Sequence, residues 1–376
     1  RLRRQAHERI SPFMKKKIIL FLSLCLLSAA VYALAAGDAS DPLASLSYLN
    51  GTFTSKVNTQ VDEKLDASDA ALLSGSGADP AGSGSVATDW AECRLKSGDT
   101  LVGQTGTSVL LLAGSGSVTF GSGAVVDVTT GSAVTSGSPL TVNHRYLTAE
   151  DTTATFTVTS KTAVLDYQGP YSFTYSSAVD YNAMAGALKT LHLFQGSFTG
   201  YGQGYDLEVA PTRLQALIMF IRVLGEEDAA LAWSGSTPFT DIAAGTQAAQ
   251  YVGYAYEKGY TNGFTATTFR PSQTITAQQY VEFMLRALGY SSNANTDLTS
   301  TFDNAVLYGV LTAGERSQLT GGTFLRADLV YVSYYALDVV EASSGQLLSQ
   351  VLQEKGVFTS AELSAAQAMV TSSRIW

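Results

Sequence analysis

The spacing of apolar residues changes character twice along the chain. In residues 40–70, apolar side chains recur every three to four positions, at Leu43, Leu46, Leu49, Phe53 and Val57, which predicts a helical segment. In residues 90–177, apolar side chains alternate with threonines, and Gly/Ser pairs interrupt the pattern at short intervals. Short strands separated by turns predict an all-β sandwich or barrel module. From residue 178 onward the helical period returns, so the chain is predicted to be multidomain.

The segments before the β module carry different signals. Residues 71–89 are rich in Gly and Ser and are typical of a flexible linker. Residues 14–35 combine a lysine cluster, an apolar run and a small-x-small end, which is typical of a secretory signal peptide. The apolar run is shorter than the roughly 20 residues of a membrane span, so we expect no membrane span after cleavage. We interpret residues 1–13, which precede Met14, as upstream non-native sequence.

The helical part repeats itself. Thr212 and Thr276 are each followed three positions later by a glutamine, Gln215 and Gln279, and 13 positions later by a glycine. Thr-x-x-Gln is a capping box at a helix start, and glycine suits the cap at a helix end. Repeats of this length predict one helix–connection–helix unit that buries its apolar face against its neighbours. We place three such units at 178–229, 236–290 and 296–342, followed by a C-terminal helix and tail at 343–376.

One residue at the helix starts conflicts with local propensity. Arg213 follows the capping threonine of the first repeat, Arg326 occupies the matching place in the third, and Ala277 replaces the arginine in the second. The helix macrodipole disfavours a cation in the first turn. A guanidinium beside a helix N-terminus suits an anion such as a carboxylate or phosphate. Spacing alone leaves open the alternative that both arginines are solvated or pair with nearby acids.

These motifs resemble the S-layer homology domains of bacterial surface proteins. The stretch "PFTDIA" supplies Phe239 and Asp241, and "TTFRPSQTITAQQ" supplies Phe269 and Pro271. "APTRLQA" matches the start of the second helix of a repeat, and "GGTFLRADLV" supplies Gly322, Phe324, Arg326 and Asp328. The resemblance covers about 180–340, and it extends to a clostridial-type subset that carries a β module ahead of the repeats.

The resemblance implies both an architecture and a ligand. Three repeats would form an all-α bundle with pseudo-threefold arrangement, whose grooves bind a secondary cell-wall polysaccharide, often one that carries a pyruvate ketal. The residues implied in binding are Arg213, Arg326, Thr212, Gln215, Asp241, Thr276, Gln279 and Asp328. The chain departs from the pattern at Ala277, in the first repeat's missing Phe-x-Asp opening, and in the third repeat's missing proline and capping threonine. These departures leave open that only one or two grooves bind.

The net charge and the cysteine count exclude some classes of partner and metal site. Residues 1–35 hold seven of the 23 basic and one of the 32 acidic residues, so the remainder has a net charge of −15. This charge argues against nucleic acid as a partner. Cys93 is the only cysteine after residue 35, which excludes an internal disulfide or a cysteine-pair metal site there. We expect no metal or cofactor, and the partners expected are the wall polysaccharide, further copies of the protein or other surface-layer proteins.

No catalytic constellation stands out. His144 and His192 are interpreted as structural, and the acidic pair Glu150–Asp151, with Asp127 and Asp166, carries no distinguishing mark. We therefore predict a non-catalytic surface protein that is attached to the wall by its repeats. The alternative is an adhesin or a glycan-active enzyme whose β module carries the activity. The tyrosines of the repeat helices, Tyr331 and Tyr335 among them, favour packing over sugar stacking.

Overall fold

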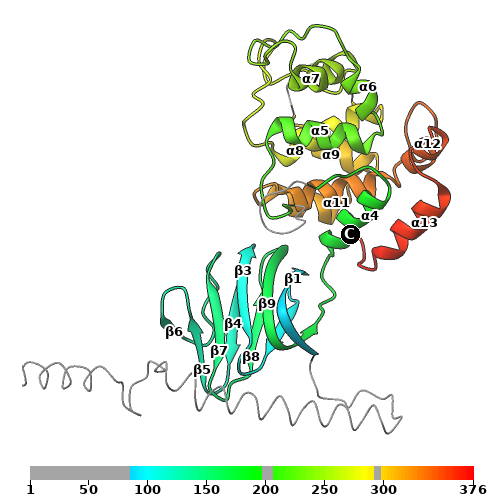
Figure 1. Ribbon diagram of the computed structural model, residues 1–376. Coiled ribbons are helices and arrows are strands. Elements are labelled where there is room, and N and C mark those ends of the chain that lie inside the picture. The colour runs from blue at the N-terminus through cyan, green and yellow to red at the C-terminus, as the bar shows by residue number, and fades with distance from the viewer. Residues whose placement is uncertain (1–84, 197–205, 292–297) are drawn as a thin grey trace, which may run out of the picture. The chain divides into compact units, whose positions relative to one another are not determined.

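The chain folds into an antiparallel β half-barrel followed by a helical region (Figure 1). The computed structural model describes residues 85–196, 206–291 and 298–376. The predicted signal peptide, the helical segment at 40–70 and most of the predicted linker lie outside the described residues.

The half-barrel is a single sheet in which every strand pairing is antiparallel. Its strands are β1 (Ser85–Lys96), β2 (Thr100–Gly103), β3 (Ser108–Ala113), β4 (Gly116–Phe120), β5 (Ala124–Asp127), β6 (Ser132–Val134), β7 (Arg145–Ala149), β8 (Ala154–Val158) and β9 (Thr162–Thr174). Figure 1 shows them side by side in one curved sheet. The predicted all-β character is confirmed, but the form is a half-barrel rather than a two-sheet sandwich. Strand β1 begins at Ser85, so residues 85–89 are strand and not linker.

The alternation that predicted strands also sets the core of this sheet. On β8, Ala154, Phe156 and Val158 are buried, while the two threonines between them are partly exposed. Strand β9 is the longest and pairs with β1, β2 and β3. One long strand that pairs with three others bends the sheet around a single apolar core.

The helical region holds the predicted helix pairs and additional helices. Its helices are α4 (Tyr181–Thr190), α5 (Arg213–Val223), α6 (Glu227–Leu231), α7 (Gln247–Glu257), α8 (Ala277–Ala287), α9 (Thr301–Leu307), α10 (Ala313–Thr320), α11 (Arg326–Ala336), α12 (Leu348–Glu354) and α13 (Ser360–Met369). The prediction of one helix after residue 343 is wrong, because two form there. Gly356, with φ of 74°, follows the end of α12, and a Thr359–Glu362 capping box starts α13.

The predicted caps are confirmed. The Thr212 hydroxyl accepts the Gln215 N–H at 3.3 Å, and the Gln215 side chain accepts the Thr212 N–H at 3.0 Å. Thr276 and Gln279 form the same box at the start of α8. The 11-residue helices α5, α8 and α11 each contact the other two. None of the helices in the described residues combines the length and the apolar character that a membrane span requires.

The single thiol of the half-barrel gives a test of this packing. Burial, with the nearby carboxylates of Asp166 and Glu92, raises the pKa of Cys93 to about 12. An exposed cysteine has a pKa of about 8.5, so at pH 8 the reactive thiolate of Cys93 is about a thousandfold scarcer. A thiolate of higher pKa is also more nucleophilic, which offsets part of this scarcity, so we expect iodoacetamide to label native Cys93 at least about tenfold more slowly than urea-unfolded Cys93, as followed by mass spectrometry. Equal rates would contradict this environment.

Candidate functional site: two arginine-lined grooves

The start of α5 is bonded to the loop of the next repeat. The N–H groups of Arg213 and Leu214 donate to the carbonyls of Gln273 and Pro271, at 2.8 and 3.2 Å. The first N–H groups of a helix have no partner within their own helix. Here the loop ahead of α8 supplies two partners, which fixes where the Arg213 side chain enters the neighbouring repeat.

The start of α11 makes the same kind of backbone hydrogen bonds. The N–H groups of Arg326 and Ala327 donate to the carbonyls of Val209 and Leu207, both at 3.0 Å. These carbonyls lie three and five residues before Thr212, as Gln273 and Pro271 lie three and five residues before Thr276. Two of the junctions between repeats are therefore built alike.

The start of α8, which lacks the arginine, differs. Among the described residues, the N–H groups of Ala277 and Gln278 make no such bond to the loop ahead of α11. A cavity of about 570 Å³ opens there instead, and its lining includes Thr276, Ala277, Gln278 and Gly322. The missing arginine thus coincides with an open junction.

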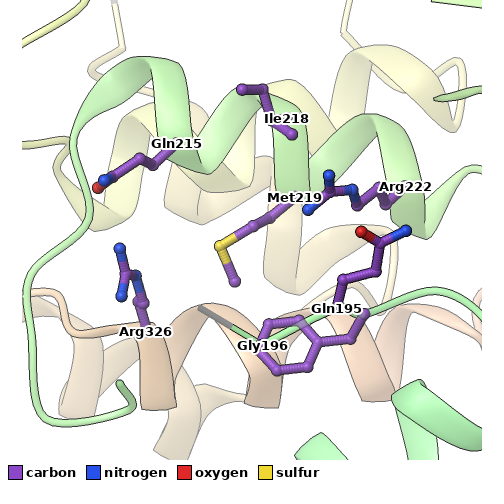
Figure 2. Close-up of a pocket in the computed structure, with 8 residues that line it drawn as sticks. Gln195, Gly196, Gln215, Ile218, Met219, Arg222 and Arg326 are labelled. Carbon is purple, nitrogen blue, oxygen red and sulfur yellow. The ribbon is translucent and has the colours of Figure 1, made fainter. Parts of the chain in front are cut away.

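A groove lies between α5 and the start of α11, and we call it the Arg326 groove. It has a volume of about 190 Å³ and is lined by Phe194, Gln195, Gly196, Gln215, Ile218, Met219, Arg222 and Arg326. Figure 2 shows the Arg326 guanidinium at one end of this groove and Arg222 at the other, with the Met219 sulfur between them. The groove therefore offers two cationic ends on either side of an apolar floor.

A second groove, the Arg213 groove, has the same design. It has a volume of about 340 Å³ and is lined by Arg213, Thr261, Asn262, Gly263, Phe264, Gln279, Glu282, Phe283, Arg286 and Leu298. Gln279, Phe283 and Arg286 lie 64 residues after Gln215, Met219 and Arg222, their equivalents in the Arg326 groove. Both grooves thus use a first-turn arginine, from α5 or α11, and one face of another helix, α8 or α5 respectively.

Charge differs between the two grooves. In the Arg326 groove, Arg326 pairs with Asp206 and Arg222 pairs with Glu227, each at 2.7 Å. Each cation there has its own carboxylate partner, so the groove is close to neutral.

In the Arg213 groove, Arg286 pairs with Glu282 at 2.9 Å, but Arg213 forms no ion pair within the described residues. Its Nε donates to the Phe269 carbonyl at 2.8 Å, and its guanidinium lies 4.9 Å from the Phe269 ring centroid. Burial and the nearby Arg270 lower the pKa of Arg213 to about 10, which still leaves the side chain charged at neutral pH. The Arg213 groove therefore carries an excess positive charge.

The remaining predicted site residues lie around the grooves rather than in them. Thr212 caps α5, and Thr276 caps α8 and lines the open junction. Asp241 accepts the N–H groups of Phe269 and Arg270 at 2.9 and 2.7 Å, which positions the carbonyl that receives Arg213. Buried Asp328 accepts the Leu325 N–H at 3.0 Å, which is the role that Gln215 has at the start of α5.

The pattern-based prediction missed Met219, Arg222, Phe283 and Arg286. A signal for the two arginines exists, because each stands ten residues after the capping threonine of its repeat. The apolar pair gave no signal, since both residues also fit an ordinary helix core.

Comparison with known proteins finds one matched domain and two bacterial relatives. The family model for the S-layer homology domain matches residues 238–280. The Middle cell wall protein of Brevibacillus brevis (strain 47 / JCM 6285 / NBRC 100599) is 30% identical over 96 residues, which is 25% of this chain and 9% of that protein. The Surface layer protein of Brevibacillus choshinensis is 29% identical over 109 residues, 29% of this chain and 10% of that protein. The chain thus spans about a tenth of the length of these curated relatives.

Solved structures add little. A recombinant pro-11S globulin of pumpkin matches 30% of this chain and 35% of its own, at 11% identity and a TM-score of 0.16, which is too low to carry an argument. Residues 238–280 thus resemble an S-layer homology domain, and that segment lies within the helical region described above. Both relatives are surface proteins by name. No cluster of potential metal ligands occurs in the part of the chain that the structure describes.

Asp241 gives a test of how the Arg213 groove is held. Replacing Asp241 with Ala removes the acceptor of two backbone N–H groups, so we expect a loss of about 1–3 kcal/mol in the free energy of unfolding. Urea unfolding followed by circular dichroism measures it. The matched control is Asp303→Ala, because Asp303 forms only an exposed ion pair with Arg316, and we expect a loss of about 0–1 kcal/mol there. Equal losses in the two variants would contradict the positioning role.

Proposed function

We propose that this protein is anchored without covalent bonds to the bacterial cell wall, through binding of an anionic secondary cell-wall polysaccharide in the Arg213 and Arg326 grooves. The observation that carries the proposal is the buried, charged Arg213, which lines a groove and has no ion-pair partner among the described residues. The S-layer homology match and the surface-protein relatives support the same function.

We propose that the repeats at 178–229, 236–290 and 296–342 form a pseudo-threefold bundle. The β module precedes the repeats in the chain and is displayed at the surface. Two observations support this arrangement. The helices α5, α8 and α11 contact one another pairwise. In addition, the first two N–H groups of α5 and of α11 are bonded at the same offsets to the loop of a neighbouring repeat.

The ligand that suits these grooves is a saccharide with a carboxylate, such as a pyruvate ketal. A guanidinium binds a carboxylate through paired, charge-assisted hydrogen bonds. The Gln279 amide stands at the same groove to meet hydroxyls, and the rings of Phe264 and Phe283 offer apolar faces to a sugar. Because the arginines of the Arg326 groove already have carboxylate partners, the Arg213 groove should contribute most of the affinity.

We further propose that the protein is not an enzyme. In the β module, Asp127 is bound by His144 at 2.7 Å and accepts the N–H groups of Thr129 and Thr130, so it shapes a turn. Hydrogen bonds from His144 and Thr130 outweigh burial and hold the pKa of Asp127 below its usual range. Such a carboxylate remains ionised, which does not suit a general acid for glycoside cleavage.

Wall binding tests the proposal directly. We expect the mature chain to sediment with purified cell walls and to lose that binding when acid treatment strips the secondary polymers. Arg213→Gln should weaken binding about tenfold or more, and Arg326→Gln should weaken it less. The control is Lys355→Gln, which removes an equal charge from an exposed lysine outside both grooves and outside the open junction and should bind as the parent does.

Each variant is first checked for its melting temperature, so that a folding defect is not read as lost binding. Equal binding to stripped and unstripped walls would overturn the polysaccharide as ligand. Equal binding by well-folded Arg213→Gln and the parent would overturn the Arg213 groove as the site.

A further inference from the structure

We propose that the third position equivalent to the two grooves binds a guanidinium instead of an anion, and that its occupant is this chain's own segment 370–376. We name this position the Glu315 site and define it by Thr312, Glu315, Tyr331 and Tyr335. The occupancy rests on contacts within the chain alone. Only the contrast with a wall ligand rests on the proposed function.

The Glu315 site is equivalent in position to the two grooves, because its loop and its helix residues stand at the same offsets in the sequence. The loop of each groove begins two residues after a residue with positive φ, His192 at 62° and Gly259 at 75°. Gly309, with φ of 73°, follows α9 in the same way and places Leu311 to Gly314 at the matching loop position. On the helix side, Tyr331 and Tyr335 stand six and ten residues after the cap of α11.

Six and ten residues after the cap Thr212 stand Ile218 and Arg222, both of which line the Arg326 groove. From Thr276 they lead to Glu282 and Arg286, which line the Arg213 groove. The loop offset and the helix offset therefore both place the third equivalent position at the Glu315 site.

Segment 370–376 fills this position with a specific set of bonds. Arg374 forms a two-point ion pair with Glu315, with its Nε 2.7 Å from Oε1 and its Nη2 2.9 Å from Oε2. Nη2 also donates to the Val310 carbonyl at 3.1 Å, and the guanidinium lies 4.8 Å from the Tyr335 ring centroid. Such a planar, bidentate and ring-stacked arrangement is specific for arginine.

Ile375, the residue after Arg374, is also fixed by hydrogen bonds. The Ile375 N–H donates to the Tyr331 hydroxyl at 3.0 Å, and that hydroxyl donates to Glu315 at 2.8 Å. The Thr312 hydroxyl donates to the Ile375 carbonyl. Both backbone polar groups of Ile375 are thus satisfied by the loop and the helix of the third repeat.

Charge explains why an anion does not suit this site. The residue ten positions after the cap, which is an arginine in both grooves, is Tyr335 at this site. In addition, Glu315 brings a carboxylate whose side chain is 1% exposed. A buried carboxylate requires a cationic partner, and Arg374 is that partner.

Helix α13 delivers the segment to the site. It packs against α4, where the Thr190 hydroxyl lies 3.7 Å from the Met369 sulfur. After α13 ends, the Ser372 hydroxyl accepts the Asp180 N–H at 3.1 Å. The segment therefore links the first helix of the bundle to the last repeat.

The test measures hydrogen exchange at the Ile375 amide by NMR, in the full mature chain. We expect this amide to be protected, and Glu315→Gln to speed its exchange at least tenfold. Glu315 also closes the capping box of α10 by accepting the Thr312 N–H at 2.7 Å. Glutamine can retain this cap, because Thr212–Gln215 and Thr276–Gln279 are capped in that way. The matched control is Glu354→Gln, which removes the same charge from an exposed carboxylate and should leave the exchange unchanged.

Arg374→Ala and Arg374→Lys complete the set. Alanine should abolish the protection, and lysine should restore it only in part because it cannot form the two-point pair. An unprotected Ile375 amide in the parent, or one that is insensitive to both Glu315→Gln and Arg374→Ala, would overturn the proposal.

Wall binding of the same samples separates this inference from the proposed function. Unchanged binding by Arg374→Ala is expected. Stronger binding by Arg374→Ala would overturn the charge argument, because it would make the segment a plug over a third anion groove. If the parent protein does not bind the wall but its Ile375 amide is protected from exchange, the proposed function is overturned and the guanidinium site is still supported.

Discussion

The helical region depends on one arrangement of hydrogen bonds, in which the first N–H groups of a helix donate to loop carbonyls of the neighbouring repeat. An isolated helix leaves these groups to solvent or to its own cap. The loop ahead of α8 satisfies two of them at the start of α5, and the loop ahead of α5 satisfies two at the start of α11. The side chain of the first helical residue must then enter the neighbouring repeat, and at both places that residue is arginine.

This constraint explains why a cation is tolerated in the first turn. The macrodipole disfavours Arg213 where it stands, but its guanidinium reaches a carbonyl and an aromatic ring of the next repeat instead of remaining near its own N-terminus. Arg326 reaches Asp206 in the same manner. The local conflict in sequence is therefore resolved by contacts between repeats, and it leaves charge at the edge of a groove.

The sequence predicted what local pattern encodes. Capping boxes, helix starts and the alternation on β8 all depend on residues within a few positions of one another. The arginines were found because they broke a local rule. Met219 and Phe283, on the opposite walls of the grooves, were missed because each looks like an ordinary core residue until the neighbouring helix is placed beside it.

Long-range contacts account for the other differences between prediction and structure. The pair between Glu315 and Arg374 joins positions 59 residues apart and has no local signature. The half-barrel form depends on the pairing of β9 with three strands, all of them distant in sequence. Alternation predicts that a segment is a strand, but it does not specify its partners.

The most direct test of the account is an NMR titration of the mature chain with acid-released wall polymer, observing the arginine side-chain Nε–H signals. We predict that the signals of Arg213 and Arg286 shift first, that those of Arg222 and Arg326 follow at higher concentration, and that the Arg374 signal stays in place. Shifts confined to the β-module residue Arg145, or a first response at Arg374, would contradict the central claim that the grooves between repeats bind the wall.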